Sequence, residues 1–215
     1  MPKYKLKPHV RACIDGANLV FLDLRMDRYR AVPTGSAPRI VGLTEDAPPK
    51  TTTEAALLAL DLIETASGAA EPCVRRGHAP ERRLVHAQDI SLTLLDAASF
   101  TGACVAAART LKARRLDITL ASLKRRKAAH RRGSQSAERI AGAFEKLRPW
   151  YPRERICLFD SLALMGFMLT RGLAPTLVLG VRTTPFAAHC WLEIDDTLVG
   201  DMSDHCASFT PIAWV

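Results

Sequence analysis

A single helical segment followed by strand-like segments constrains the fold of this chain more than any other feature. The apolar run that opens at Cys157 has helical periodicity, and Gly172 is a suitable residue for ending the helix that it predicts. Extended segments rich in β-branched and apolar residues follow at 176–182, 188–194 and 198–201. A helix followed by consecutive strands predicts an α+β fold with a C-terminal antiparallel sheet.

Three residues in this stretch have the order that a cysteine hydrolase needs. Cys157 opens the predicted helix, His189 lies in the second predicted strand, and Asp201 ends the third. A thiolate at a helix N-terminus is stabilised by free backbone N–H groups and by the helix dipole. A histidine can then pair with it as imidazolium while a carboxylate fixes the imidazole tautomer. The alternative for Cys157 is a buried structural thiol in an amphipathic helix.

The identity of the acid is left open by spacing alone. A two-residue turn at 195–196 would put Asp201 on the sheet face opposite His189, and Asp204 would then share the histidine's face. A longer connection, or a bulge at Gly200, would return Asp201 to the side of His189. Spacing therefore predicts a Cys-His-Asp site without deciding between the two carboxylates.

The rest of the chain divides into a β-rich beginning and a helical middle. Segments 10–14, 18–24 and 28–32 predict a three-stranded meander, and 54–65 predicts a helix. Proline, glycine and arginine from 67 to 83 interrupt any periodicity, which is typical of a linker. Helical patterns then predict helices near 89–97, 99–113, 116–130 and 136–147.

Composition excludes several classes of protein. The chain of 215 residues is 48% hydrophobic and 24% charged, which is typical of a globular protein. No apolar run approaches the roughly 20 residues of a membrane span, and no signal-type apolar segment follows the basic N-terminus. We therefore expect a cytoplasmic protein without a membrane partner, whose cysteines are free thiols. Cys190, His205 and Cys206 match no standard zinc spacing, so the sequence predicts no metal site.

The net charge of +8 is concentrated in the helical middle. Basic residues crowd 109–132, which taken alone would suggest a surface for binding polyanions. Leucines recur through the same segment at helical spacing, so a solvated helix face is the favoured interpretation. We expect no nucleic-acid partner.

Residues 147–215 resemble the C-terminal half of lasso peptide biosynthesis B proteins. The similar pieces are RPWYP at 148–152, CLFDSLAL at 157–164, GVR at 180–182, PFAAHCWLE at 185–193 and FTPI at 209–212. The resemblance implies a transglutaminase-like (papain-like) cysteine protease domain, with helices before the antiparallel sheet. It also implies Cys157 as nucleophile, His189 as base and Asp201 as acid, and it is the reason for preferring Asp201.

The same resemblance implies a function in peptide maturation. Proteins of this family hydrolyse the leader from a ribosomally made lasso peptide precursor. An ATP-dependent, asparagine-synthetase-like partner then closes the macrolactam ring on the freed N-terminus. The protease itself is expected to need no cofactor, while the synthetase needs ATP. The alternative is a non-catalytic carrier that binds the leader and presents the precursor to the synthetase.

Residues 4–32 resemble, more weakly, the small leader-recognition domain of these systems, which has a winged-helix-like β3α3 fold. The resemblance implies two domains, at 1–85 for leader recognition and at 86–215 for the protease. An extended leader would be captured by strand addition to an exposed sheet edge. The residues expected to bind it are Leu24, Arg28, Tyr29, Arg30, Ala31 and Val32.

Overall fold

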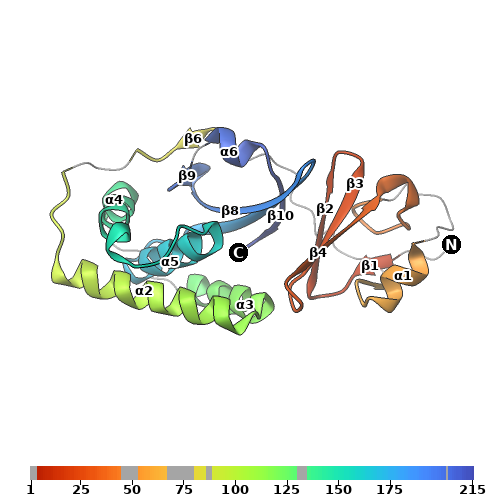
Figure 1. Cartoon of the computed structure of the whole chain (residues 1–215), viewed down its shortest axis with the longest axis horizontal. Helices are drawn as coiled ribbons and strands as arrows, with labels where there is room; N and C mark the ends of the chain where they lie inside the picture. The colour runs from red at the N-terminus through yellow and green to blue at the C-terminus, as the bar shows by residue number, and fades with distance from the viewer. Residues whose placement is uncertain (1–3, 45–52, 67–79, 86–88, 130–134, 202) are drawn as a thin grey trace.

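The computed structural model describes residues 4–44, 53–66, 80–85, 89–129, 135–201 and 203–215. Figure 1 shows the N-terminal strands gathered at one end of the molecule and the helices with the C-terminal sheet at the other. Both helices and strands are abundant, so the structure confirms the mixed α+β prediction.

The predicted N-terminal meander is present. Strands β2 (Val10–Asp15), β3 (Asn18–Asp23) and β4 (Arg28–Pro33) pair in antiparallel fashion in the order β2-β3-β4. Gly16 (φ +56°) and Asp27 (φ +51°) lie in the connecting turns, where a left-handed backbone is needed. In the part of the chain that the structure describes, β4 pairs only with β3, so its other edge is open.

The predicted helix over 54–65 is wrong in its second half. Helix α1 (Glu54–Ala59) stops where Asp61 takes a positive φ of 56°, and the chain continues as β5 (Ile63–Thr65), which pairs with β1 (Tyr4–Leu6). Burial of Leu62 and Ile63 in the N-terminal core outweighs their helical spacing. A short 3₁₀ turn, η1 (Thr34–Ser36), follows β4. The described residues up to 85 contain one α-helix, so the β3α3 winged-helix-like arrangement is not confirmed.

Helices α2 (Leu94–Ala113), α3 (Leu116–Ala128), α4 (Ala137–Leu147) and α5 (Cys157–Thr170) form the helical part. The separate helices predicted at 89–97 and 99–113 are wrong, because α2 is continuous and begins only after Thr93. Thr93 and Asp96 form a reciprocal capping box at its start. On α3 the leucines are buried and Lys124, Arg125 and Arg126 are exposed, as expected for a solvated basic face.

The C-terminal sheet has the strand order β10-β7-β8-β9-β6. It is antiparallel except where β6 (Arg82–Arg83) pairs in parallel with β9 (Thr197–Val199). The other strands are β7 (Thr176–Thr183), β8 (Phe186–Ile194) and β10 (Thr210–Trp214). Helix α5 packs on β8 and buries most of its side chains, and the short helix α6 (Ser203–Ala207) follows β9.

The two ends of the molecule share a hydrophobic core. Cys13, Val20, Leu22 and Leu24 of the N-terminal meander are buried together with side chains of α2 to α5, β7 and β8. Asp15 extends the contact, since its carboxylate accepts hydrogen bonds from Thr183 and Thr210 of the C-terminal sheet, at 2.6–2.7 Å. The division at residue 85 stays a prediction, and β6, just before it, pairs with the C-terminal sheet.

No helix within the described ranges is long and apolar enough to cross a membrane.

Candidate active site

Cys157 is the first residue of α5, as the sequence predicts. Ile156 precedes it in an extended conformation and provides no side-chain cap, so the first-turn N–H groups stay available beside the sulfur. The thiol is half-buried and lines a cavity of about 250 Å³ that also contains His189 and Asp201. An apolar helix thus presents its N-terminal thiol to an accessible cavity.

The loop before Cys157 is held by a buried arginine. Arg148 is 2% exposed. Its side chain pairs with Asp160 of α5 and donates to the backbone carbonyls of Tyr151, Arg153 and Glu154. These contacts fix the approach of the chain to the start of α5. The RPWYP segment therefore has a structural role in placing the thiol.

His189 lies on β8, opposite Gly180 of β7. A side chain at Gly180 would collide with Trp191, since an added Cβ would lie 2.7 Å from the indole ring. That space lets Trp191 lie beside His189, with ring centroids 6.0 Å apart, while its Nε1 donates to Glu193 at 2.8 Å. The glycine thus makes room for the packing that orients the histidine.

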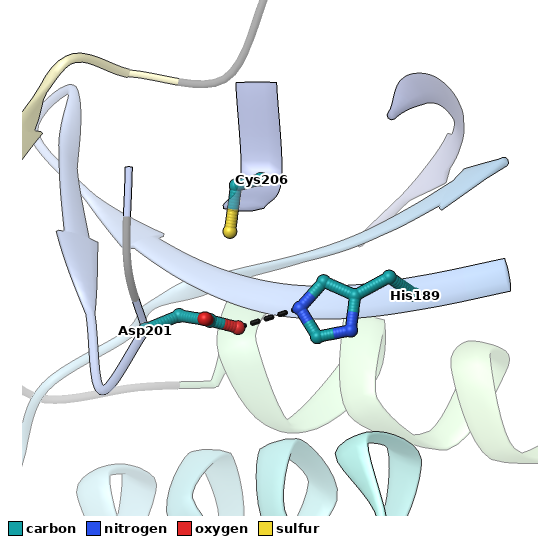
Figure 2. Close-up of side chains that lie close together, drawn as sticks. All are labelled: His189, Asp201 and Cys206. Carbon is teal, nitrogen blue, oxygen red and sulfur yellow. Dashed lines mark hydrogen bonds and ion pairs between the residues drawn. The ribbon is translucent and has the colours of Figure 1, made fainter. Parts of the chain in front are cut away.

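Asp201 is the acid that reaches the histidine. The distance between His189 Nε2 and Asp201 Oδ2 is 2.6 Å (Figure 2). The turn after β8 has two residues, and β9 ends at Val199, after which Gly200 adopts a φ of +76°. This left-handed residue turns Asp201 back to the side of His189, while Asp204 lies exposed on α6. Geometry favours Asp201, and its catalytic role stays a prediction.

The electrostatics favour a thiolate and imidazolium pair. Hydrogen bonds from the Cys190 thiol and the His189 ring lower the pKa of Cys157 to about 4, against the effect of burial. Burial disfavours the charged His189 ring, but hydrogen bonds with Asp201, Cys157 and Cys206 outweigh it and raise its pKa to about 11. Because the thiol pKa lies far below the imidazole pKa, the pair is ionised across neutral pH.

Two further cysteines lie at the site. From the sequence we considered both only as zinc ligands and did not place them beside Cys157 and His189. The Cys190 thiol donates to Cys157, and the resulting contact and its burial raise the pKa of Cys190, so it stays protonated. The Cys206 thiol is fully buried near His189 and Asp201. The adjacency of Cys190 to His189 was a signal in the sequence, whereas the place of Cys206 depends on how α6 folds back.

The predicted leader-binding residues lie on and beside β4. Leu24 is buried, 3% exposed, and its carbonyl accepts from the Asp117 N–H at the start of α3. Residues 28–32 follow the open edge of β4, with both arginines exposed. The Tyr29 ring contacts Phe186 of β8 edge-on, with centroids 5.6 Å apart. The open strand is thus connected to the strand that carries His189.

The comparison with protein families decides the membership of the chain. Residues 100–214 match the family model described as the transglutaminase-like superfamily, over more than half of the chain. The chain belongs to the transglutaminase-like superfamily. Within that superfamily, a thiol at a helix start and a histidine on the following sheet are consistent with a papain-like cysteine protease or acyltransferase fold. No curated protein and no solved structure matches the chain.

Proposed function

We propose that this chain is a cytoplasmic cysteine peptidase that removes the leader from a lasso peptide precursor. One observation carries the proposal: the Cys157 thiol, at the start of α5, pairs with His189, whose Nε2 lies 2.6 Å from Asp201. The family match supports the fold of such an enzyme, and the leader comes from the resemblance of 147–215 to lasso peptide B proteins.

The reaction follows from the roles of these groups. The Cys157 thiolate attacks the scissile carbonyl carbon, and the N–H groups of the first turn of α5 stabilise the oxyanion. The His189 imidazolium protonates the departing amine, which leaves as the new N-terminus of the core peptide. His189, now neutral, takes a proton from water, the hydroxide attacks the thioester, and Cys157 leaves as thiolate. The leader departs with a new C-terminal carboxylate.

Asp201 orients the ring throughout this cycle. Its hydrogen bond to Nε2 leaves the other ring nitrogen for Cys157, since each nitrogen directs one bond in the ring plane. The carboxylate also stabilises the imidazolium that each proton transfer forms. This chemistry needs no cofactor, and ATP enters at the partner synthetase that joins the freed amine to a side-chain carboxyl.

The leader binds along the open edge of β4 in this proposal. An added strand would pair with residues 28–32 through backbone hydrogen bonds. The Tyr29–Phe186 contact, three residues before His189, connects that edge to the active site. Leader binding therefore raises the effective concentration of the scissile bond at Cys157.

The test is the mass of the precursor after incubation with the full chain, with and without the synthetase. Wild type and a Cys104→Ala variant, which removes a buried thiol of α2 outside the site, are expected to cleave one bond. Cys157→Ala is expected to cleave none. Equal inertness of all three proteins, with the leader still bound, would contradict the peptidase and make the chain a carrier that presents the precursor.

A further inference from the structure

His189, Asp201 and Cys206 form a compact group of metal-ligating side chains. A histidine nitrogen, a carboxylate oxygen and the cysteine sulfur all lie within 4.8 Å of one another. Figure 2 shows the sulfur directed toward the space between the carboxylate and the ring. His189 lies on β8, Asp201 directly follows Gly200, and Cys206 lies on α6. Their spacing in the sequence matches no standard metal-binding pattern.

The donor set selects the kind of cation. Imidazole nitrogen, thiolate sulfur and one carboxylate are typical zinc ligands, whereas Ca²⁺ and Mg²⁺ take about six or more oxygens. Zinc bonds of about 2.0–2.3 Å in tetrahedral geometry place neighbouring ligand atoms roughly 3.3–3.8 Å apart. Donor atoms already within 4.8 Å need only small side-chain movements to reach that arrangement.

The surroundings provide access and support. His189 and Asp201 line the cavity of about 250 Å³, while Cys206 is fully buried and forms the closed side of the group. A metal would therefore have three protein ligands and a fourth position toward the cavity, the pattern of an open zinc site. The His189 ring is held by His205 and Phe209, with centroids 4.5 and 5.2 Å away.

We propose that His189, Asp201 and Cys206 bind one Zn²⁺ ion, and that the bound ion stops peptide hydrolysis. Binding displaces one proton from His189 Nε2 and one from the Cys206 thiol. With zinc on one nitrogen and a proton on the other, the ring is neutral and a much weaker acid than the imidazolium, so it no longer protonates the departing amine. The inhibition rests on the proposed function, whereas the metal binding does not.

Binding is tested on the full chain with Co²⁺ as the spectroscopic probe and with Zn²⁺ by calorimetry. Wild type and Cys157→Ala are expected to give a cobalt–thiolate charge-transfer band that Zn²⁺ abolishes. Cys206→Ser is expected to lose the band and to bind Zn²⁺ at least about tenfold more weakly, because the soft ligand is lost. A band lost in Cys157→Ala and kept in Cys206→Ser would overturn the assignment, because the metal would then lie on the nucleophile.

A second variant guards against misfolding, since Cys206 is buried. Asp201→Asn changes a half-buried side chain and is also expected to weaken Zn²⁺ binding, while Asp204→Asn is the matched control and should bind like wild type. Thermal unfolding of each variant verifies that it is folded. Wild-type affinity for Zn²⁺ in Asp201→Asn would refute the site.

Precursor cleavage is measured separately, so that the two proposals can fail independently. Zn²⁺ is expected to inhibit wild type in proportion to its occupancy, with recovery on chelation. Cobalt binding without any cleavage would support the metal site and contradict the peptidase. Cleavage by a protein that gives no cobalt band would contradict the metal site alone.

Discussion

Removal of the Asp201 carboxylate tests how the site holds its histidine. In Asp201→Ala the 2.6 Å hydrogen bond to His189 Nε2 is lost, while Cys157 and the backbone of β8 are unchanged. A hydrogen bond to a charged group contributes about 1.5–3 kcal/mol. Because the charged form of His189 loses this stabilisation, the pKa of His189 should fall by about 1–2 units.

The consequence is a defined change in the pH profile. The His189 pKa of about 11 sets the alkaline limb of kcat/KM, so Asp201→Ala should move that limb to roughly pH 9–10. If the same energy is lost from the transition state, kcat/KM near neutral pH falls about 10–100-fold. Asp201→Asn should be intermediate, because the amide oxygen still accepts from Nε2 but carries no charge.

The assay is precursor cleavage followed by mass spectrometry between neutral pH and pH 11. Asp204→Ala is the matched control, because that carboxylate is exposed on α6, and it should behave like wild type. A wild-type profile in Asp201→Ala together with a defect in Asp204→Ala would refute the geometric assignment of the acid.

Three further predictions test a hydrogen bond at the active site, an ion-paired helix cap and a contact between the two ends of the molecule. Cys190→Ala should raise the pKa of Cys157 by about 1–2 units, because the thiolate loses a hydrogen-bond donor, whereas Cys190→Ser keeps a donor. The pKa is measured as the midpoint of Cys157 alkylation against pH, resolved by peptide. An unchanged midpoint in the alanine variant would count against the contact. Asp96→Ala should lower the free energy of unfolding by about 3–5 kcal/mol, because it breaks a buried ion-paired cap, while Asp117→Ala at a surface pair should cost under about 1 kcal/mol. The pKa of Asp96 is lowered by its arginine partner, so its contribution is present above pH ~4 and is lost on acidification, which urea unfolding at two pH values measures. Asp15→Ala should lower the free energy of unfolding by about 2 kcal/mol at neutral pH, and wild-type stability would show that its contacts to the C-terminal sheet contribute little.

Local patterns in the sequence were sufficient to predict the elements that carry the site. The start of α5 at Cys157 and the strand around His189 follow from short-range periodicity, and so does the N-terminal meander. Each depends on residues close in sequence. The prediction failed where packing between residues distant in sequence determines the secondary structure. At Asp61 the helix ends and the chain continues into β5, because the residues that follow are buried in the N-terminal core.

The identity of the acid could not be decided from the sequence, because one backbone angle controls it. With the two-residue turn at 195–196, the alternation of side chains between the two faces of the sheet favours Asp204. The positive φ of Gly200 instead brings Asp201 to His189. The place of Cys206 was missed for a related reason. Its sulfur reaches the histidine only because α6 folds over the sheet, a contact that no local pattern encodes.

Cys157 is a thiolate at neutral pH because the Cys190 thiol and the His189 ring both hydrogen-bond to its sulfur. The most direct test is its alkylation rate against pH, resolved by peptide mass spectrometry, in wild type and in His189→Ala. We expect a midpoint near pH 4 in wild type and a shift toward the ordinary thiol value of about 8.5 in the variant, where the Cys190 donor remains. A wild-type midpoint near 8.5, unchanged in His189→Ala, would refute the thiolate–imidazolium pair.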